Sequence, residues 1–488
     1  MMMETQLLWI IALPLLAAVA IGLVGQRYAN IREAITLITG ASLAWLVWSL
    51  FPEVLAGARP AAHLVSILPG ISLEFKIEPL GMLFAALASL LWIVNSIYSI
   101  GYMRGNNEQH QTRFYVCFAV AIAGAMGVAM AENLLTLFVF YEVLTLSTYP
   151  LVAHKGDAKS VAAARVYLGI LLATSMGLLL PAIIWTYSVT GTLAFTSGGI
   201  LEGHVAGPAV GLLLALFVFG TGKAALMPVH KWLPSAMVAP TPVSALLHAV
   251  AVVKAGVFTI TKIVVYIFGI DFLAASPSSG WLVYAAVFTI VAASFIALRQ
   301  TNLKRLLAYS TIAQLSYVIL ATALLVPFSV MAAALHIVAH AFGKITLFFA
   351  AGSIYTASKK TELAQLHGIG RRMPWTMGAF TIGALSMIGV PPTAGFISKW
   401  YLLTGSFQAE NYLAIAAIVV STLLNAAYFL PIVYNAWFKA ESEPPAIDHR
   451  EAPLAIVIAL SITASLTVMF FWVNQPAIDL AAQMVGAK

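Results

Sequence analysis

Charge and cysteine are what this sequence has least of. Asp, Glu, Lys and Arg together make up 9% of its 488 residues and hydrophobic residues 61%, a balance far outside that of soluble globular proteins. The single cysteine, Cys117, lies inside an apolar run, and one thiol cannot form an internal disulfide, hold a metal cluster or attach a c-type haem. No stretch has the composition of a linker or a detachable soluble domain. The sequence therefore predicts an integral membrane protein.

Long apolar runs fill most of the chain. A hydrocarbon core of ~30 Å needs ~20 apolar residues per helix, so about fourteen membrane-spanning helices are expected in a single membrane domain, 1–488. The runs are too long and too uniformly apolar for the ~10-residue alternating strands of a membrane barrel, which predicts an all-α polytopic fold. The first run is full length and is not expected to be a cleaved signal. The expected spans are 7–25, 34–55, 79–101, 113–131, 133–153, 161–188, 208–228, 242–268, 280–298, 303–322, 328–355, 373–405, 411–438 and 452–474.

Basic residues are distributed very unevenly between the expected loops. Of the 25 Lys and Arg residues, seventeen, Lys304 among them, fall in loops after odd-numbered spans. Only Arg59, Lys76 and Lys488 fall in loops after even-numbered spans or in the tails. The positive-inside rule then puts the odd loops in the cytoplasm and both termini on the outer face of the cytoplasmic membrane. The formal net charge of +7 thus reflects orientation, and no nucleic-acid partner is expected.

Six ionisable side chains remain within the expected spans. A charge at mid-helix costs ~2.5–3.5 kcal/mol, so such a set is expensive unless its members face one another or water. A structural tie between helices explains any single member, but Ser, Thr or Asn would make such a tie at lower cost. Buried lysines can exchange protons near neutrality, which favours a proton relay. The six are Glu142, Lys223, Lys254, Lys262, Lys344 and Lys399, of which Lys262 is expected to snorkel to a nearby helix end.

Histidines accompany these lysines. His336, His340 and Lys344 follow one another at four-residue spacing in HIVAHAFGK, so all three are expected on one face of one helix. His248 precedes Lys254 by six residues, which leaves open a bridge from Lys254 to another group or a bond to a backbone carbonyl. Paired imidazoles also suggest haem, but the third member of the stripe is a lysine and nothing else indicates a redox centre. No cofactor or metal is expected.

Prolines interrupt two of the expected spans. Pro228 follows Lys223 in the seventh span, and Pro391 and Pro392 precede Lys399 in the twelfth. Broken helices at membrane depth are tolerated where the backbone is buried in protein or lines a wet cavity. Because the broken spans are five apart, the units 112–268 and 280–438 are expected to form an inverted repeat of five helices each. The rest of the chain is 1–111, with the first three spans, and 452–488, with the last span and a tail.

The chain closely resembles the proton-translocating antiporter-like family shared by Mrp sodium/proton antiporters, respiratory complex I and membrane-bound hydrogenases. The segments that carry the resemblance are FYEVLTLSTYPLV, KAALMPVHKWLPSAMVAPTPVSALLHAVAVVKAG and GVPPTAGFISKW. The resemblance covers about 75 to 435. It implies that HLVSILPGISLEFKIEPLG, before the third span, is the extracellular β-hairpin of the family.

The resemblance also implies roles for the ionisable residues. Glu142 and Lys223 would form an ion pair, Lys254 would be the central lysine and Lys399 the terminal one. The stripe of His336, His340 and Lys344 would lie between the last two, on a hydrated axis along which protons pass.

Chain length and this residue set are most similar to the Mrp D subunit. The function expected is that of a proton-conducting subunit, without catalysis of its own, in a multi-subunit cation/proton antiporter. Its partners would be other membrane subunits, lipid, protons and, for an Mrp complex, Na⁺. Subunits of complex I, hydrogenases or inorganic-carbon uptake complexes are alternatives. Two complex I members fit poorly, because one has glutamate in place of Lys399 and the longest carries a lateral helix after its last span. A stand-alone solute carrier would need a compact pocket, whereas these residues are spread over five spans.

Overall fold

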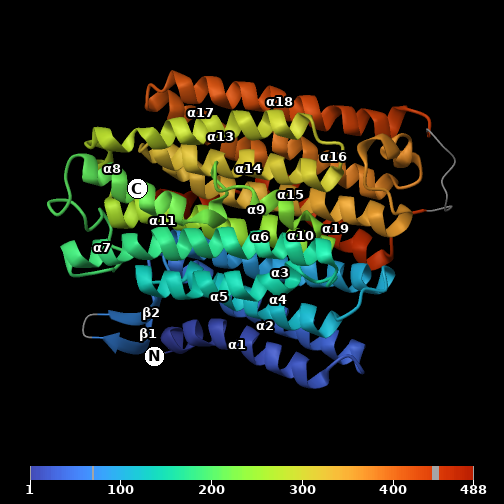
Figure 1. Ribbon diagram of the computed structural model, residues 1–488, viewed down its shortest axis with the longest axis horizontal. Coiled ribbons are helices and arrows are strands. Elements are labelled where there is room, and N and C mark those ends of the chain that lie inside the picture. Colours follow the sequence, from blue (N-terminus) through green and yellow to red (C-terminus); the bar gives the residue numbers. More distant parts are fainter. Residues whose placement is uncertain (1, 69–70, 442–449, 487–488) are drawn as a thin grey trace.

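The protein is a bundle of long helices. The computed structural model describes residues 2–68, 71–441 and 450–486, so the predicted tail residue Lys488 lies outside the described part. Helices run side by side along the long direction of Figure 1. The first half contains α1 (Met2–Val24), α2 (Ala29–Leu55), α3 (Pro79–Gly105), α4 (Gln111–Ala129), α5 (Leu134–Val152), α6 (Ala158–Thr174), α7 (Leu180–Thr190), α8 (Pro208–Gly220), α9 (Trp232–Ser235), α10 (Thr241–Ala245), α11 (Val252–Ile263) and α12 (Ile270–Ala274). The second half contains α13 (Trp281–Leu298), α14 (Leu303–Ala323), α15 (Pro327–Ser358), α16 (Pro374–Ile388), α17 (Ala394–Gln408), α18 (Tyr412–Phe438), α19 (Leu454–Trp472) and α20 (Gln475–Met484).

The all-α polytopic membrane fold predicted from hydropathy is confirmed. Among the described residues, twelve helices are long and apolar enough to cross a membrane. Two of them are continued through π-helical turns, so that α6 and α7 form one helix, 158–190, and α10 and α11 lie in another, 241–268. The two predicted spans without such a helix are the seventh and the twelfth, which are each split. The count of continuous membrane-length helices is therefore twelve among the described residues, and the fourteen predicted crossings include the two split segments.

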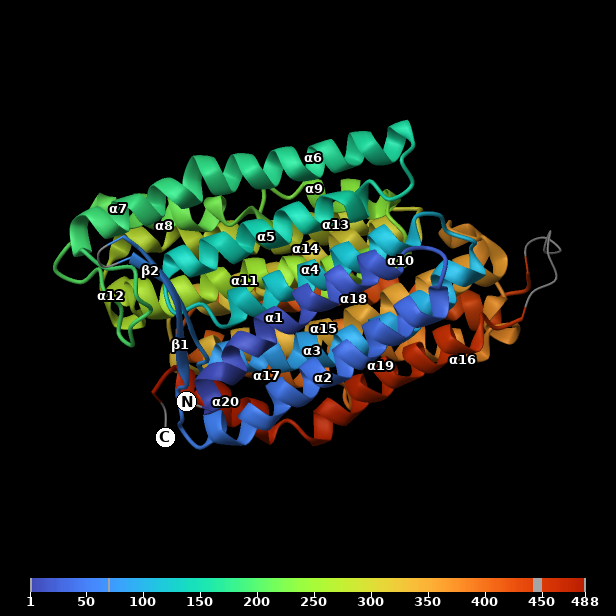
Figure 2. The same cartoon turned by 90° about the horizontal axis from the view of Figure 1, so that it is seen from below.

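A β-hairpin marks one side of the bundle. Strands β1 (Ala61–Leu68) and β2 (Ile71–Lys76) pair antiparallel, with Ala61 opposite Lys76, which confirms the hairpin predicted before the third span. The hairpin is tied to the bundle where the Lys76 amide donates to the Met130 carbonyl at 2.7 Å. Figure 2 shows α20 and the beginning of α1 at this same end. We call this end the hairpin side and the opposite end, where α1 meets α2, the distal side.

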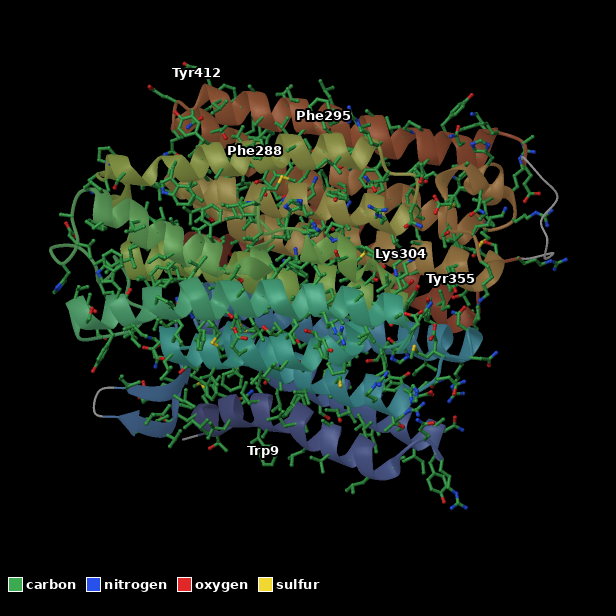
Figure 3. The ribbon with its side chains drawn as sticks, viewed as in Figure 1. Trp9, Phe288, Phe295, Lys304, Tyr355 and Tyr412 are labelled. Carbon is green, nitrogen blue, oxygen red and sulfur yellow. The ribbon has the colours of Figure 1, made fainter. Side chains whose placement is uncertain are left out.

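Two of the helices that carry predicted functional residues lie at the centre of the bundle. The membrane-length windows of 241–268 and of α15 are 100% buried within the protein, against 39% for α1 and 33% for α2. Large apolar side chains on outer helices point away from the bundle, as Trp9, Phe288 and Phe295 do in Figure 3. Because lipid is as apolar as these side chains, such an outer surface is stable only in a membrane. Polar groups on α11 and α15 therefore face other helices.

The predicted C-terminal tail contains a helix that was not predicted from the sequence. α20 follows α19 directly and packs against α3 and α15 on the hairpin side. Its Gln483 side chain donates to the Leu55 carbonyl at 2.7 Å and accepts from Arg59 Nη2 at 2.7 Å. These bonds tie the end of the chain to the end of α2.

One buried histidine lies outside the membrane-spanning segments, in the turn between α5 and α6. His154 packs against Phe114, and its Nε2 lies 3.9 Å from Glu108 Oε2. Burial, and to a smaller extent the nearby Arg113 cation, lowers the pKa of His154 to about 4. Burial also raises the pKa of Glu108. His154 is therefore neutral at pH 7, and this contact is not an ion pair there.

Candidate proton-transfer site

Lys223 lies at the break in the seventh predicted span. α8 ends at Gly220 and Lys223 follows in a single 3₁₀ turn, Gly222–Ala224. Pro228, predicted as a helix-breaking residue, lies eight residues after the end of α8, within the irregular stretch that follows it. The turn packs closely on α11 at Gly256, where a Cβ atom would lie 2.3 Å from the Ala224 nitrogen. Only glycine permits that approach.

The Lys223 ammonium group is held by α5. Its Nζ donates to the Tyr141 carbonyl at 2.8 Å and to Thr145 Oγ1 at 2.5 Å, and it lies 3.1 Å from the centre of the Tyr141 ring. These contacts stabilise a cation by hydrogen bonds and by the negative face of the ring. They explain how a lysine can be charged in a fully buried position.

Glu142 directly follows Tyr141 on α5, yet its side chain does not bond to Lys223. Both of its carboxylate oxygens are buried and lack a hydrogen-bond partner among the described residues. The direct ion pair implied by the family resemblance is thus not a contact in this structure, although the two charges are close enough to interact electrostatically. A buried carboxylate without a partner is costly and is retained where it has a function.

The central lysine meets the histidine stripe. Lys254 Nζ on α11 and His340 Nδ1 on α15 are 2.6 Å apart, and both side chains are fully buried. A hydrogen bond between two bases needs one proton, which either an ammonium or an imidazole N–H can supply. The contact therefore permits two protonation states that differ by the transfer of one proton.

The stripe continues towards the second broken span. The rings of His340 and His336 lie on one face of α15, as predicted, with their centres 6.0 Å apart. His336 Nδ1 lies 2.8 Å from Ser398 Oγ on α17, and Ser398 directly precedes Lys399. Ser398, which sequence reasoning missed, brings the stripe to the residue that precedes the terminal lysine. Two ring nitrogens, Nε2 of each histidine, have no hydrogen-bond partner in the described part of the chain.

Lys344 bonds to α14 and not to the histidines of its own stripe. One turn after His340, its Nζ donates to Ser310 Oγ on α14 at 2.8 Å and to the Leu307 carbonyl at 3.3 Å. Ser310 Oγ also accepts from the Tyr428 hydroxyl at 3.1 Å. Lys344 is therefore linked to a hydroxyl pair between α14 and α18.

Lys399 binds the end of a helix. α16 ends at Ile388 and α17 begins at Ala394, a break that brackets the predicted Pro391 and Pro392. Lys399 Nζ donates back to the carbonyls of Met387 and Ile388 at 2.9 and 2.8 Å. The last carbonyls of a helix have no partner within it and carry partial negative charge. The break thus supplies the acceptors that make a buried cation tolerable at this position.

His248 forms neither of the bonds that its spacing suggested. It lies in a π-helical turn, Leu246–Val250, and its ring centre is 4.7 Å from that of Phe348 on α15. Both ring nitrogens are buried without a hydrogen-bond partner among the described residues. The π turn adds a residue to the helical repeat, so angles from regular helical spacing do not hold here.

Two further lysines differ from their predicted positions, Lys262 being buried and Lys304 partly buried. Lys262 does not snorkel, because the residues after β2 cover it: its Nζ lies 2.6 Å from Glu78 Oε1 and donates to the Ala131 carbonyl at 2.6 Å. Lys304 is not in a loop but in the first turn of α14, where its Nζ donates to the Ala239 carbonyl at 2.6 Å. It lines a cavity of about 250 Å³ with Tyr355, which lies close to it in Figure 3. In the sequence, the position of Glu78 directly before the third span was the one indication of a partner for Lys262.

Together, these contacts form two groups. One group runs from α11 through α15 to the second break: Lys254 contacts His340, the rings of His340 and His336 lie 6.0 Å apart, and His336 contacts Ser398, the residue before Lys399. Glu142 and Lys223 form a separate group at the first break, adjoining α11 through Gly256. Bases, hydroxyls and a carboxylate arranged in this way can accept and release protons at mid-membrane depth.

Comparisons with known proteins show the family and the fold of the chain. A family model described as NADH:quinone oxidoreductase/Mrp antiporter, TM, matches residues 131–425. NADH-quinone oxidoreductase subunit N of Desulforudis audaxviator is 34% identical over 454 residues, covering 91% of this chain and 89% of that protein. The chloroplastic NAD(P)H-quinone oxidoreductase subunit 5 of Ipomoea purpurea is 32% identical over 75% of this chain, which spans only 53% of that longer protein. A chain in the structure of the Mrp complex from Dietzia sp. superposes with a TM-score of 0.86 over 99% of this chain at 22% identity, which shows a shared fold.

Proposed function

The chain belongs to the NADH:quinone oxidoreductase/Mrp antiporter family, and from this premise we propose that it is the proton-conducting subunit of a multi-subunit cation/proton antiporter, of the Mrp D type. The subunit would have no catalysis of its own and no cofactor. Its partners would be other membrane subunits, and its transported ions protons and, through those partners, Na⁺.

The observation that carries the proposal is the contact between Lys254 and His340. Two buried bases 2.6 Å apart can share or exchange one proton. From His340 the proton would pass to His336, and from there through Ser398 to Lys399 at the second break. Each of these groups is buried, so a proton on the path is not lost to bulk solvent.

Glu142 and Lys223 would control entry to this series. In the present arrangement Lys223 is held by Tyr141 and Thr145, and the Glu142 carboxylate is free to accept a proton. Movement of the lysine towards Glu142 would form the ion pair seen in the family pattern and would free the Tyr141 carbonyl. His248, buried without a partner close to α15, and Lys344 would be further proton acceptors beside the main path.

The orientation follows from the basic loops. We assign the distal side to the cytoplasm and the hairpin side to the outer face of the cytoplasmic membrane. The segments 112–268 and 280–438 each contain one split span, at Gly220 and at Ile388, which supports an inverted repeat with a break in each half.

A proton-pumping subunit of a complex I-type enzyme is the second candidate. The specific observation in its favour is the 34% identity with a subunit N over most of both chains. The same residues would then move protons in response to a redox reaction in partner subunits. Purification with its partners distinguishes the two, since a complex I-type assembly contains redox subunits and an antiporter does not.

Proton movement in everted membrane vesicles tests the proposal. Lys254→Ala removes one of the two bases in the central contact and is expected to reduce dye-reported proton movement at least tenfold, with the complex still assembled. Lys359→Ala is the matched control, because Lys359 is an exposed lysine at the end of α15, bonded to Asn106. Normal proton movement in Lys254→Ala would refute the proposed path.

A further inference from the structure

A groove on the distal side of the bundle has the features of a ligand site. It has a volume of about 530 Å³ and lies between α6, α9 and α14. α9 has only four residues and is followed by one 3₁₀ turn, Ala236–Val238, so this part of the split seventh span is too short to fill the space between its neighbours. The groove is therefore a consequence of the same break that holds Lys223.

Three cations line the groove from three different elements. Lys159 lies on α6, Lys231 precedes α9 and Arg305 lies on α14. All three are exposed, none forms an ion pair among the described residues, and no Asp or Glu lines the groove. The carboxylate of Asp157, two residues before Lys159, is engaged with the Ser160 amide at 2.6 Å as the cap of α6. Three positive charges thus line the groove without a carboxylate in its lining, although Asp157 partly offsets the charge of Lys159, and this balance favours an anionic ligand.

The deeper part of the groove is apolar. Ala162, Ala163 and Val166 continue the face of α6 that begins with Lys159, over about two turns towards the middle of the membrane. Pro234 and Val238 face them from α9 and the turn after it. The groove therefore combines cations near the membrane surface with apolar residues at greater depth.

We infer that this groove binds an anionic phospholipid, with the phosphate headgroup against Lys159, Lys231 and Arg305 and an acyl chain along α6. Tyr309 lines the same groove, and its hydroxyl can be a further hydrogen-bond partner for phosphate and glycerol oxygens. A soluble phosphate compound would use the cations but not the apolar wall. Basic pockets between membrane helices on the cytoplasmic side are a known setting for such headgroups.

A bound lipid would stabilise the irregular stretch around α9. The α9 segment follows Pro228 and is linked to the break at Lys223, because Trp232 Nε1 donates to the Gly222 carbonyl at 2.9 Å. Ligand bound to Lys231 would thus hold a segment that packs directly on the proposed proton site. Lipid binding in this groove requires only that the chain spans a membrane, and it does not depend on proton transport.

Lipid binding to the purified full-length chain tests the inference. Native mass spectrometry counts bound phosphatidylglycerol and phosphatidylcholine in detergent, and a thermal melt with added short-chain lipid gives relative affinities. The test variant is Lys159→Gln/Lys231→Gln/Arg305→Gln. Each cation removed is expected to weaken phosphatidylglycerol binding roughly fivefold, and all three together on the order of a hundredfold.

The control carries the same loss of charge elsewhere. Arg27→Gln/Arg299→Gln/Lys439→Gln removes three exposed cations that do not line the groove and should leave binding unchanged. Equal loss in both triple variants would mean a general charge effect and would overturn the inference. So would equal stabilisation by inorganic phosphate alone, or by phosphatidylcholine, because neither uses both halves of the groove. If the assembled complex excludes phosphatidylglycerol while the isolated chain binds it, a partner subunit occupies the groove and the lipid assignment is wrong.

Discussion

Lys262→Met is expected to destabilise the protein more than any other single lysine substitution on the hairpin side. The substitution keeps the length of the side chain but leaves Glu78 buried without its cation. At an effective dielectric constant of about 20, charges at the observed 2.6 Å attract each other by about 6 kcal/mol, which the cost of removing both from water partly offsets. Removing one member of a buried pair typically costs about 3–5 kcal/mol, and we expect a loss in this range.

The chain contains a matched control for this prediction. Lys76 and Glu132 also form a pair close to the hairpin, at 3.2 Å, but their side chains are 34% and 20% exposed. Lys76→Met should therefore cost at most about 1 kcal/mol, as solvent-exposed pairs do. Both variants can be compared by detergent-denaturant titration followed by tryptophan fluorescence.

A double-mutant cycle completes the test. Replacing both partners, as Glu78→Gln/Lys262→Met, should cost less than the sum of the two single substitutions, because no unpaired charge is left buried. If Lys262→Met proves no more destabilising than Lys76→Met, the buried ion pair is not an energetic unit, and the interpretation of Lys262 as a lysine that reaches the surface is restored.

Three other predictions concern the proton path and the α5–α6 turn. Glu142→Gln should abolish proton-coupled transport in everted vesicles without loss of assembly, and retained transport would show that a titratable carboxylate is not needed there. His340→Ala should slow transport and Lys344→Ala should slow it too; wild-type rates in both would leave them a structural role only. His154→Gln should flatten the dependence of stability on pH: because the folded pKa is about 4 and the unfolded value about 6.5, the wild type loses up to about 3 kcal/mol as pH falls from 6.5 towards 4. The same slope in wild type and variant in a pH series of thermal melts would exclude His154 as its source, and Arg113→Gln is the companion that should reduce the slope only in part.

Hydropathy and spacing predicted the features that depend on neighbouring residues in the chain. The helical membrane fold and the family are confirmed, and the hairpin before α3 is present. His336 and His340 share one face of α15 because a regular helix repeats every four residues or so, which spacing alone predicts. Pro391 and Pro392 mark the second break, since neither can continue the hydrogen bonding of α16.

Features that depend on distant residues were missed or misplaced. Lys262 was expected at the surface because nothing in its own helix indicates that Glu78, from a remote segment, covers it. Pro228 indicates a break in the seventh span but not where it begins, since α8 already ends at Gly220 and the turn at Lys223 packs closely on Gly256. Ser398 carries no signal of its own and matters only because folding brings His336 to it.

Proton flux through Lys254→Arg tests the central claim most directly. Arginine keeps a positive charge at the position but does not release its proton in the accessible pH range, so it separates proton transfer from fixed charge. In everted vesicles with equal amounts of assembled complex, we expect dye-reported proton movement to fall at least tenfold at every pH. Wild-type flux in this variant would contradict the claim that a proton passes between Lys254 and His340.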